Sequence, residues 1–226
     1  MKITKLFTAK DNVVALINED YNILPVLSRF SLPLGFGNKT IGELCDDSGI
    51  DVNVFLLMVN FLLSGTIDEK LVGKVSASDV VDFLHNSHDY YLSYKFPHIR
   101  ANLLNALDQH HSDINPIIIN FFDDYIRLVR QHFKYEEEVV FPYVKSLAKG
   151  VKTNYTIDVF RRHHDDEVSE KLSELKNIIL RYYTTSMPYK MYDVLVDIYN
   201  CEEDLDSHAE IENSILIPMI TRIEKQ

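Results

Sequence analysis

The chain has 226 residues, with 23 basic and 34 acidic side chains and a formal net charge of −11. This acidic balance excludes the basic surfaces that bind nucleic-acid phosphates or anionic membranes. Two cysteines are too few for a disulfide scaffold or a cysteine-based zinc site. Because the sequence shows neither a signal peptide nor a stretch long enough to span a membrane, we expect a cytoplasmic protein.

Glycine and histidine divide the chain into two parts. Six of the seven glycines lie within the first 73 residues, and all nine histidines lie after that point. Since glycine punctuates short elements, residues 1–73 are predicted to form a small helical N-terminal domain. Residues 74–226 are predicted to form a second domain that contains every histidine.

Short helices are expected in the first domain. A helix over residues 12–30 is interrupted at Pro25. Thr40 and Glu43 form a capping box at the start of a second helix. A third helix over residues 52–63 is apolar nearly all round, which predicts burial against the second domain or against a second subunit in a homodimer. It carries no Arg or Lys, which disfavours a DNA-binding helix-turn-helix.

The second domain contains four long helical segments. They span residues 78–108, 115–150, 156–183 and 186–226. Asn115 and Pro116 begin the second segment as a cap and a first-turn proline, and Pro97 predicts a kink in the first. Short loops between long helices favour an up-down-up-down four-helix bundle. Because no sustained period-two alternation occurs, the chain is predicted to be all-α.

A repeat with an offset of 76 residues links the two halves of this bundle. Its matching polar residues are His88 and His164, His132 and His208, and Glu136 and Glu212. Residues four apart share one face of a helix, so each His-x-x-x-Glu projects an imidazole and a carboxylate together. The repeat therefore brings four imidazoles and two carboxylates to the bundle core, a set that predicts a metal site.

Other polar residues of the bundle lack this doubled pattern. A single His-x-x-x-Glu is usually an ordinary helical pair, and a single buried His is usually a satisfied core residue. The five remaining histidines are expected to have ordinary roles: His85, His98, His110, His111 and His163. Glu137 and Glu138 are expected on an exposed face, while Tyr91 and Phe122 are expected in the core.

The donor set narrows the choice of metal. Imidazole and carboxylate without thiolate suit iron, manganese or zinc. Two bridging carboxylates, Glu136 and Glu212, with open coordination positions indicate two iron ions joined by an oxo or hydroxo bridge. Such a centre would work with oxygen, nitric oxide or peroxide.

These motifs resemble the hemerythrin-like family of di-iron four-helix bundles. The oxygen-carrying members have a third-helix His-x-x-x-His and a late His followed by Asp, whereas this chain has Val168 and Asn213 at those positions. The resemblance therefore implies one imidazole fewer and a more open iron pair.

The set of four His and two Glu is similar to the RIC subgroup, which is associated with repair of iron–sulfur centres after nitrosative or oxidative stress. Residues 21–61 resemble the short N-terminal domain of that subgroup. Where the subgroup has Cys-Cys-Gly-Gly, this chain has Leu34-Gly35-Phe36-Gly37. The thiols of that motif are missing here.

The resemblance implies a non-haem di-iron protein that binds or reacts with nitric oxide or oxygen species and contacts iron–sulfur proteins. The missing thiols favour a second hypothesis, an oxygen- or iron-sensing module without catalysis. A ferritin-like oxidase or peroxidase and a metal-free structural bundle are the remaining alternatives.

Overall fold

The computed structural model describes residues 6–108, 113–151, 153–163 and 167–225. Their regular elements are all helices, and an isolated bridge between Asn12 and Thr40 is the one strand-like pairing within these ranges. The all-α prediction is confirmed. Within the same ranges, no helix has the length and apolar character needed to cross a membrane.

The structure divides into two compact units. One contains residues Met1–Ser87, Val144–Asn154 and Glu210–Gln226, and the other contains His88–Tyr143 and Tyr155–Ala209. The division falls within the first, second and fourth long segments, and the third lies wholly in the second unit. The domain boundary placed after residue 73 stays a prediction.

Each of the four long segments predicted from sequence is helical. The first contains α6 (Ala77–Asp89), η2 (Tyr90–Lys95) and α7 (Phe96–Ala106), and the second contains α8 (Asn115–Tyr135), η3 (Glu136–Val140) and α9 (Phe141–Ala148). The third contains α10 (Ile157–His163) and α11 (Glu167–Tyr182), and the fourth contains α12 (Pro188–Ile211), η4 (Glu212–Leu216) and α13 (Ile217–Glu224).

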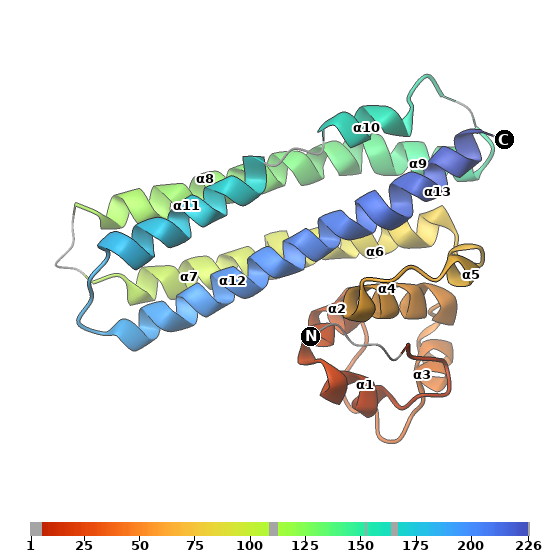
Figure 1. The fold of residues 1–226 in the computed structure, drawn as a ribbon, viewed down its shortest axis with the longest axis horizontal. Coiled ribbons are helices and arrows are strands. Elements are labelled where there is room, and N and C mark those ends of the chain that lie inside the picture. The colour runs from red at the N-terminus through yellow and green to blue at the C-terminus, as the bar shows by residue number, and fades with distance from the viewer. Residues whose placement is uncertain (1–5, 109–112, 152, 164–166, 226) are drawn as a thin grey trace. The chain divides into compact units, whose positions relative to one another are not determined.

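The second unit contains a four-helix bundle. Figure 1 shows α7, α8, α11 and α12 running side by side, with each helix antiparallel to the one before it in the chain. One apolar core joins all four helices, and its fully buried members include Phe122, Ile118, Leu175 and Ile198. The up-down-up-down topology follows from the short connections between amphipathic helices.

In the described part of the chain, three turns of π-helix interrupt the long helices, and each ends two residues before a proline. In η2, η3 and η4 the backbone N–H groups of Phe96, Phe141 and Ile217 donate to carbonyls five residues earlier. The prolines that follow lack an N–H, so they cannot donate the ordinary bond to the fourth residue before them. A π-turn therefore precedes Pro97, where the sequence predicts a kink, and such turns often mark functional sites.

The first unit contains a group of short helices. These are α1 (Val13–Glu19), η1 (Tyr21–Ile23), α2 (Leu24–Arg29), α3 (Ile41–Ser48), α4 (Val52–Ser64) and α5 (Glu69–Val72). The predicted break at Pro25 is wrong, because Asp20 ends α1 with an extended backbone and Pro25 lies in the first turn of α2. Side chains of α4 from Val54 to Phe61 are buried, as its composition predicts. The homodimer stays a prediction.

The start of α3 carries the predicted capping box. The Thr40 hydroxyl accepts from the Glu43 N–H at 3.2 Å, and the Glu43 carboxylate accepts from the Thr40 N–H at 2.8 Å. These bonds, led by the one from the backbone of Thr40, hold the pKa of Glu43 below its ordinary value. Because the folded pKa is lowered, this contribution is present above the ordinary range of Glu and is lost as the pH falls through the lowered value.

Replacing Thr40 with alanine is expected to lower the free energy of unfolding by about 1 kcal/mol, since an orphan N–H of the first helical turn loses its acceptor. Denaturant unfolding at neutral pH measures this loss. Glu43→Gln is the matched control, because its amide oxygen still accepts from the Thr40 N–H. A Thr40→Ala variant as stable as the parent would contradict the role of the cap.

Candidate metal centre

Four buried polar side chains lie at the points where the long helices pass through or near their π-turns. His88 lies near the end of α6, and Glu136 is the first residue of η3. His208 and Glu212 lie one turn apart on the continuous helix formed by α12 and η4. All four are at most 3% exposed. Burying two imidazoles and two carboxylates is costly unless they bind one another or an ion.

The ligand atoms of these four residues converge. One nitrogen or oxygen from each of His88, Glu136, His208 and Glu212 lies within 4.8 Å of all the others. The Nε2 atoms of His88 and His208 are 3.3 Å apart. Two ring nitrogens and two carboxylates of this kind form the type of donor set that binds a metal cation.

Glu136 lies between two imidazoles. Its Oε2 is 2.9 Å from Nε2 of His88, and its Oε1 is 2.9 Å from Nε2 of His132. The second contact is the i, i+4 pair that the His-x-x-x-Glu pattern predicts. Because its two oxygens face different imidazoles, the Glu136 carboxylate has the orientation of a bridging ligand.

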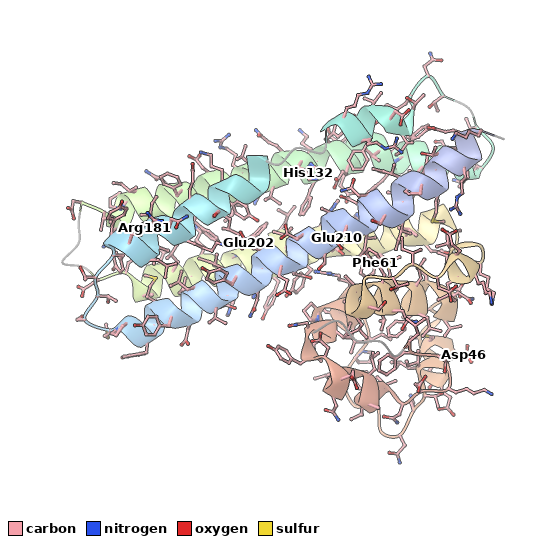
Figure 2. All side chains as sticks on the ribbon, in the orientation of Figure 1. Asp46, Phe61, His132, Arg181, Glu202 and Glu210 are labelled. Atoms are coloured by element: carbon pink, nitrogen blue, oxygen red, sulfur yellow. The ribbon has the colours of Figure 1, made fainter. Side chains whose placement is uncertain are left out.

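The structure describes the side chains of five of the six predicted ligands. His88, Glu136, His208 and Glu212 form the converging group. His132 contacts Glu136, and its side chain is 24% exposed, so this edge of the site reaches solvent. Figure 2 shows His132 on α8, in the long bundle. His164 lies outside the described residues. That these six residues ligate a metal stays a prediction.

Aromatic rings surround His88. The rings of Phe133 and Phe141 lie nearly parallel to its imidazole, at centroid distances of 3.9 and 5.3 Å and interplanar angles of 16° and 12°. The buried ring of Tyr91 meets His208 edge-on at 6.1 Å. Tyr91 is thus a core residue, as expected, and it also lines the site. These rings fix the plane of His88 and shield the cluster from water.

Glu137 contacts the site, which corrects the prediction that it belongs to an exposed face. Its Oε1 lies 2.7 Å from Nδ1 of His88. The neighbouring Glu138 does lie on the surface, with a side chain that is 64% exposed and 3.7 Å from Lys134. One signal was available in the sequence: Phe133, Glu137 and Phe141 are spaced four residues apart, and all three face His88.

The histidines outside the repeat have the ordinary positions expected of them where the structure describes them. His85 is exposed. His98 is also exposed, 3.7 Å from Asp197. His110 and His111 lie outside the described residues, and for His163 only the backbone is described.

The residues present fit a metal cation. Two carboxylates with ligand atoms within 4.8 Å of each other repel strongly in a buried site. A bound cation would remove this repulsion, and the ring nitrogens of His88 and His208 would serve as further ligands. Iron, manganese and zinc all accept this combination of imidazole and carboxylate.

A comparison with protein-family models bears directly on this site. The model described as hemerythrin HHE cation binding domain matches residues 79–220, which is more than half of the chain. The chain belongs to the hemerythrin family. It is thus a hemerythrin-like helical protein with a domain that binds metal cations. The matched hemerythrin region includes all six predicted ligands and excludes the helices that precede α6. Among curated proteins, no sequence matches this chain.

Proposed function

We propose that this hemerythrin-like protein is a non-haem di-iron protein that binds or reacts with nitric oxide or oxygen species. The observation that carries the proposal is the Glu136 carboxylate, which contacts two imidazoles within a buried group of His and Glu ligand atoms. The six residues of the repeat would hold the iron, the imidazoles as terminal ligands and Glu136 and Glu212 as carboxylate ligands. Iron bound in this way supplies redox chemistry and an open coordination position.

The protein around the site would bind a small ligand selectively. Phe133, Phe141 and Tyr91 exclude water from the side of the site next to His88 and His208. His132 lies at the solvent-reaching edge, so a diatomic ligand would enter there rather than through the aromatic layer. The apolar rings that line one side of the site favour small neutral ligands such as nitric oxide and oxygen over charged ones.

Metal analysis of purified protein tests the centre first. The parent is expected to hold iron at a near-stoichiometric level, whereas His132→Ala and Glu212→Ala are each expected to lose most of it. His98→Ala is the matched control, because His98 is an exposed imidazole outside the converging group. Unchanged metal content in both site variants would overturn the ligand assignment.

Rapid mixing of the reduced protein with nitric oxide tests the reaction. An iron–nitrosyl signal is expected in the parent and not in Glu212→Ala. A stable, reversible oxygen spectrum would instead support a binding or sensing module without catalysis. Absence of both signals in iron-loaded protein would count against this function.

Repair of iron–sulfur centres in the cytoplasm, with iron–sulfur proteins as partners, is the process that the RIC resemblance adds to this proposal. The absence of the Cys-Cys-Gly-Gly thiols, where this chain has Leu34-Gly35-Phe36-Gly37, favours the sensing alternative. The two cysteines of the chain, Cys45 and Cys201, are both buried. At the position of the missing thiol motif, the Phe36 side chain is buried. Chemistry that needs an accessible thiol is thus not available to this chain, which leaves the metal centre to act alone.

Both cysteines are expected to react slowly with iodoacetamide in the native protein. Burial raises the pKa of the Cys45 thiol to about 12, so it stays protonated at neutral pH, whereas the thiolate is the reactive form. Alkylation at pH 7 is expected to be at least about 100-fold slower than in urea-unfolded protein, where the pKa returns to about 8.5. Mass spectrometry measures the rates, and rapid native labelling of Cys45 would contradict the prediction.

A further inference from the structure

The environment of His88 determines which of its ring nitrogens faces the cluster. Its Nε2 points toward Glu136 at 2.9 Å and toward Nε2 of His208 at 3.3 Å. Its Nδ1 points the other way, 2.7 Å from Oε1 of Glu137. An ionised carboxylate oxygen only accepts hydrogen bonds, so the Glu137 contact is made when Nδ1 carries the proton and Nε2 is left to bind a metal. His88 would then be the neutral tautomer, whose Nε2 lone pair faces the site and would bind the metal.

We propose that Glu137 is a positioning residue, which holds His88 as a metal ligand by accepting the Nδ1 proton. This rests on the proposed metal centre. Carboxylates that hydrogen-bond a ligating imidazole fix its tautomer and raise its basicity, and their loss costs about 10–100-fold in metal affinity. Glu137 acts on the metal through His88, because its carboxylate is not among the ligand atoms that converge in the described part of the chain.

The packing around His88 explains why a single hydrogen bond, the one to Glu137, is sufficient to orient its ring. The two phenyl rings parallel to His88, Phe133 and Phe141, limit its imidazole to one plane. Within that plane the ring could still rotate by 180° and exchange its nitrogen and carbon atoms. The bond to Glu137 selects one of these two orientations, the one that directs Nε2 toward Glu136. Phe133, Glu137 and Phe141 belong to the same helical segment. One face of that segment therefore both stacks on His88 and orients its ring.

The partial exposure of Glu137 also suits this role. Its side chain is 33% exposed, whereas the Glu136 side chain is fully buried. A partly hydrated carboxylate keeps its negative charge without the full cost of burial, and it can therefore stabilise the positive charge that a metal places on the imidazole.

Three variants test the proposal with zinc as the probe, because zinc is diamagnetic and needs no redox partner. Glu137→Ala removes the acceptor, and Glu137→Gln keeps an acceptor oxygen but loses the charge. Glu138→Gln is the matched control, since Glu138 is the adjacent carboxylate and lies on the surface. Zinc affinity is measured by competition with a chelator, and histidine tautomers are measured by nitrogen-15 NMR of the zinc-loaded protein.

Glu137→Ala is expected to weaken zinc binding by about 10–100-fold and to remove the protected Nδ1–H signal of one histidine. Glu137→Gln is expected to keep that signal with a smaller loss of affinity, and Glu138→Gln to match the parent. If Glu137→Ala fails to fold, Glu137→Gln decides, because loss of charge alone should still lower the affinity. Parent-like affinity and NMR spectra in both Glu137 variants would overturn the proposal.

These measurements separate this proposal from the proposed function. A parent that takes up zinc, with the expected effects at Glu137, supports the positioning role even if iron-loaded protein gives no signal with nitric oxide. A parent that takes up no zinc overturns the metal centre and the role of Glu137 together. Reaction of iron-loaded protein with nitric oxide, alongside unchanged Glu137 variants, overturns the positioning role alone.

Discussion

Glu136→Ala is expected to weaken metal binding more than any other single substitution in the site, by over about 100-fold. Loss of an outer hydrogen-bonding partner costs about 10–100-fold, and Glu136 is proposed as a direct ligand, whose loss should cost more. Its two oxygens face His88 and His132, so its loss removes the group that joins the two imidazoles. The adjacent carboxylates do not take its place, because Glu137 faces Nδ1 of His88 and Glu138 lies on the surface.

Thermal unfolding with and without added ferrous iron measures this effect independently of any reaction. A ligand at 100 times its dissociation constant stabilises the folded state by about 2.7 kcal/mol. For a chain of this size, such stabilisation raises the melting temperature by roughly 5–11 °C. The parent is expected to show this increase, and Glu136→Ala is expected to show none.

Glu138→Ala is the matched control for this experiment, since it removes a carboxylate from the same acidic run but from an exposed position. It is expected to keep the full increase in melting temperature on iron addition. An equal increase in Glu136→Ala would show that the metal binds elsewhere on the acidic surface, and it would overturn the bridging role.

Local sequence signals were sufficient for most of the fold. Apolar spacing predicted the four long helices. Thr40 predicted the start of α3, because the side chains of Thr40 and Glu43 each accept a hydrogen bond from the other residue's backbone N–H. The sequence predicts the helix break at Pro25, which is tolerated in the first turn of α2. The break lies at Asp20, whose side chain caps the start of η1. Proline alone therefore did not show where the helix ends.

The 76-residue repeat predicted which polar residues converge, but it could not reveal what orients them. The position equivalent to Glu137 in the second half is Asn213, so the repeat gave no reason to single out Glu137. Its contact with His88 joins residues 49 apart in the chain, and such pairing depends on how the helices pack. The π-turn that begins at Glu136 also changes the helical period just after this position.

Phe133→Ala is expected to lower the free energy of unfolding by about 3–5 kcal/mol, the usual cost of deleting a buried phenyl ring from a core. Phe133 is 2% exposed, and its ring centroid lies 3.9 Å from that of His88 and 5.5 Å from that of His208. The same substitution is therefore expected to loosen two proposed ligands as well as the core. Denaturant unfolding of the metal-free protein and zinc competition measure the two effects separately.

Phe122→Ala is the control that distinguishes packing from ligand placement. Phe122 lies on the same helix, is 1% exposed and belongs to the same core, but its ring neighbour is Tyr125 rather than an imidazole. Both variants are expected to lose similar stability, while only Phe133→Ala should also lose zinc affinity at a temperature where both are folded. Equal zinc affinity in the two variants would mean that the ring of Phe133 contributes only to the core. The orientation of His88 would then depend on Glu137 and Phe141 alone.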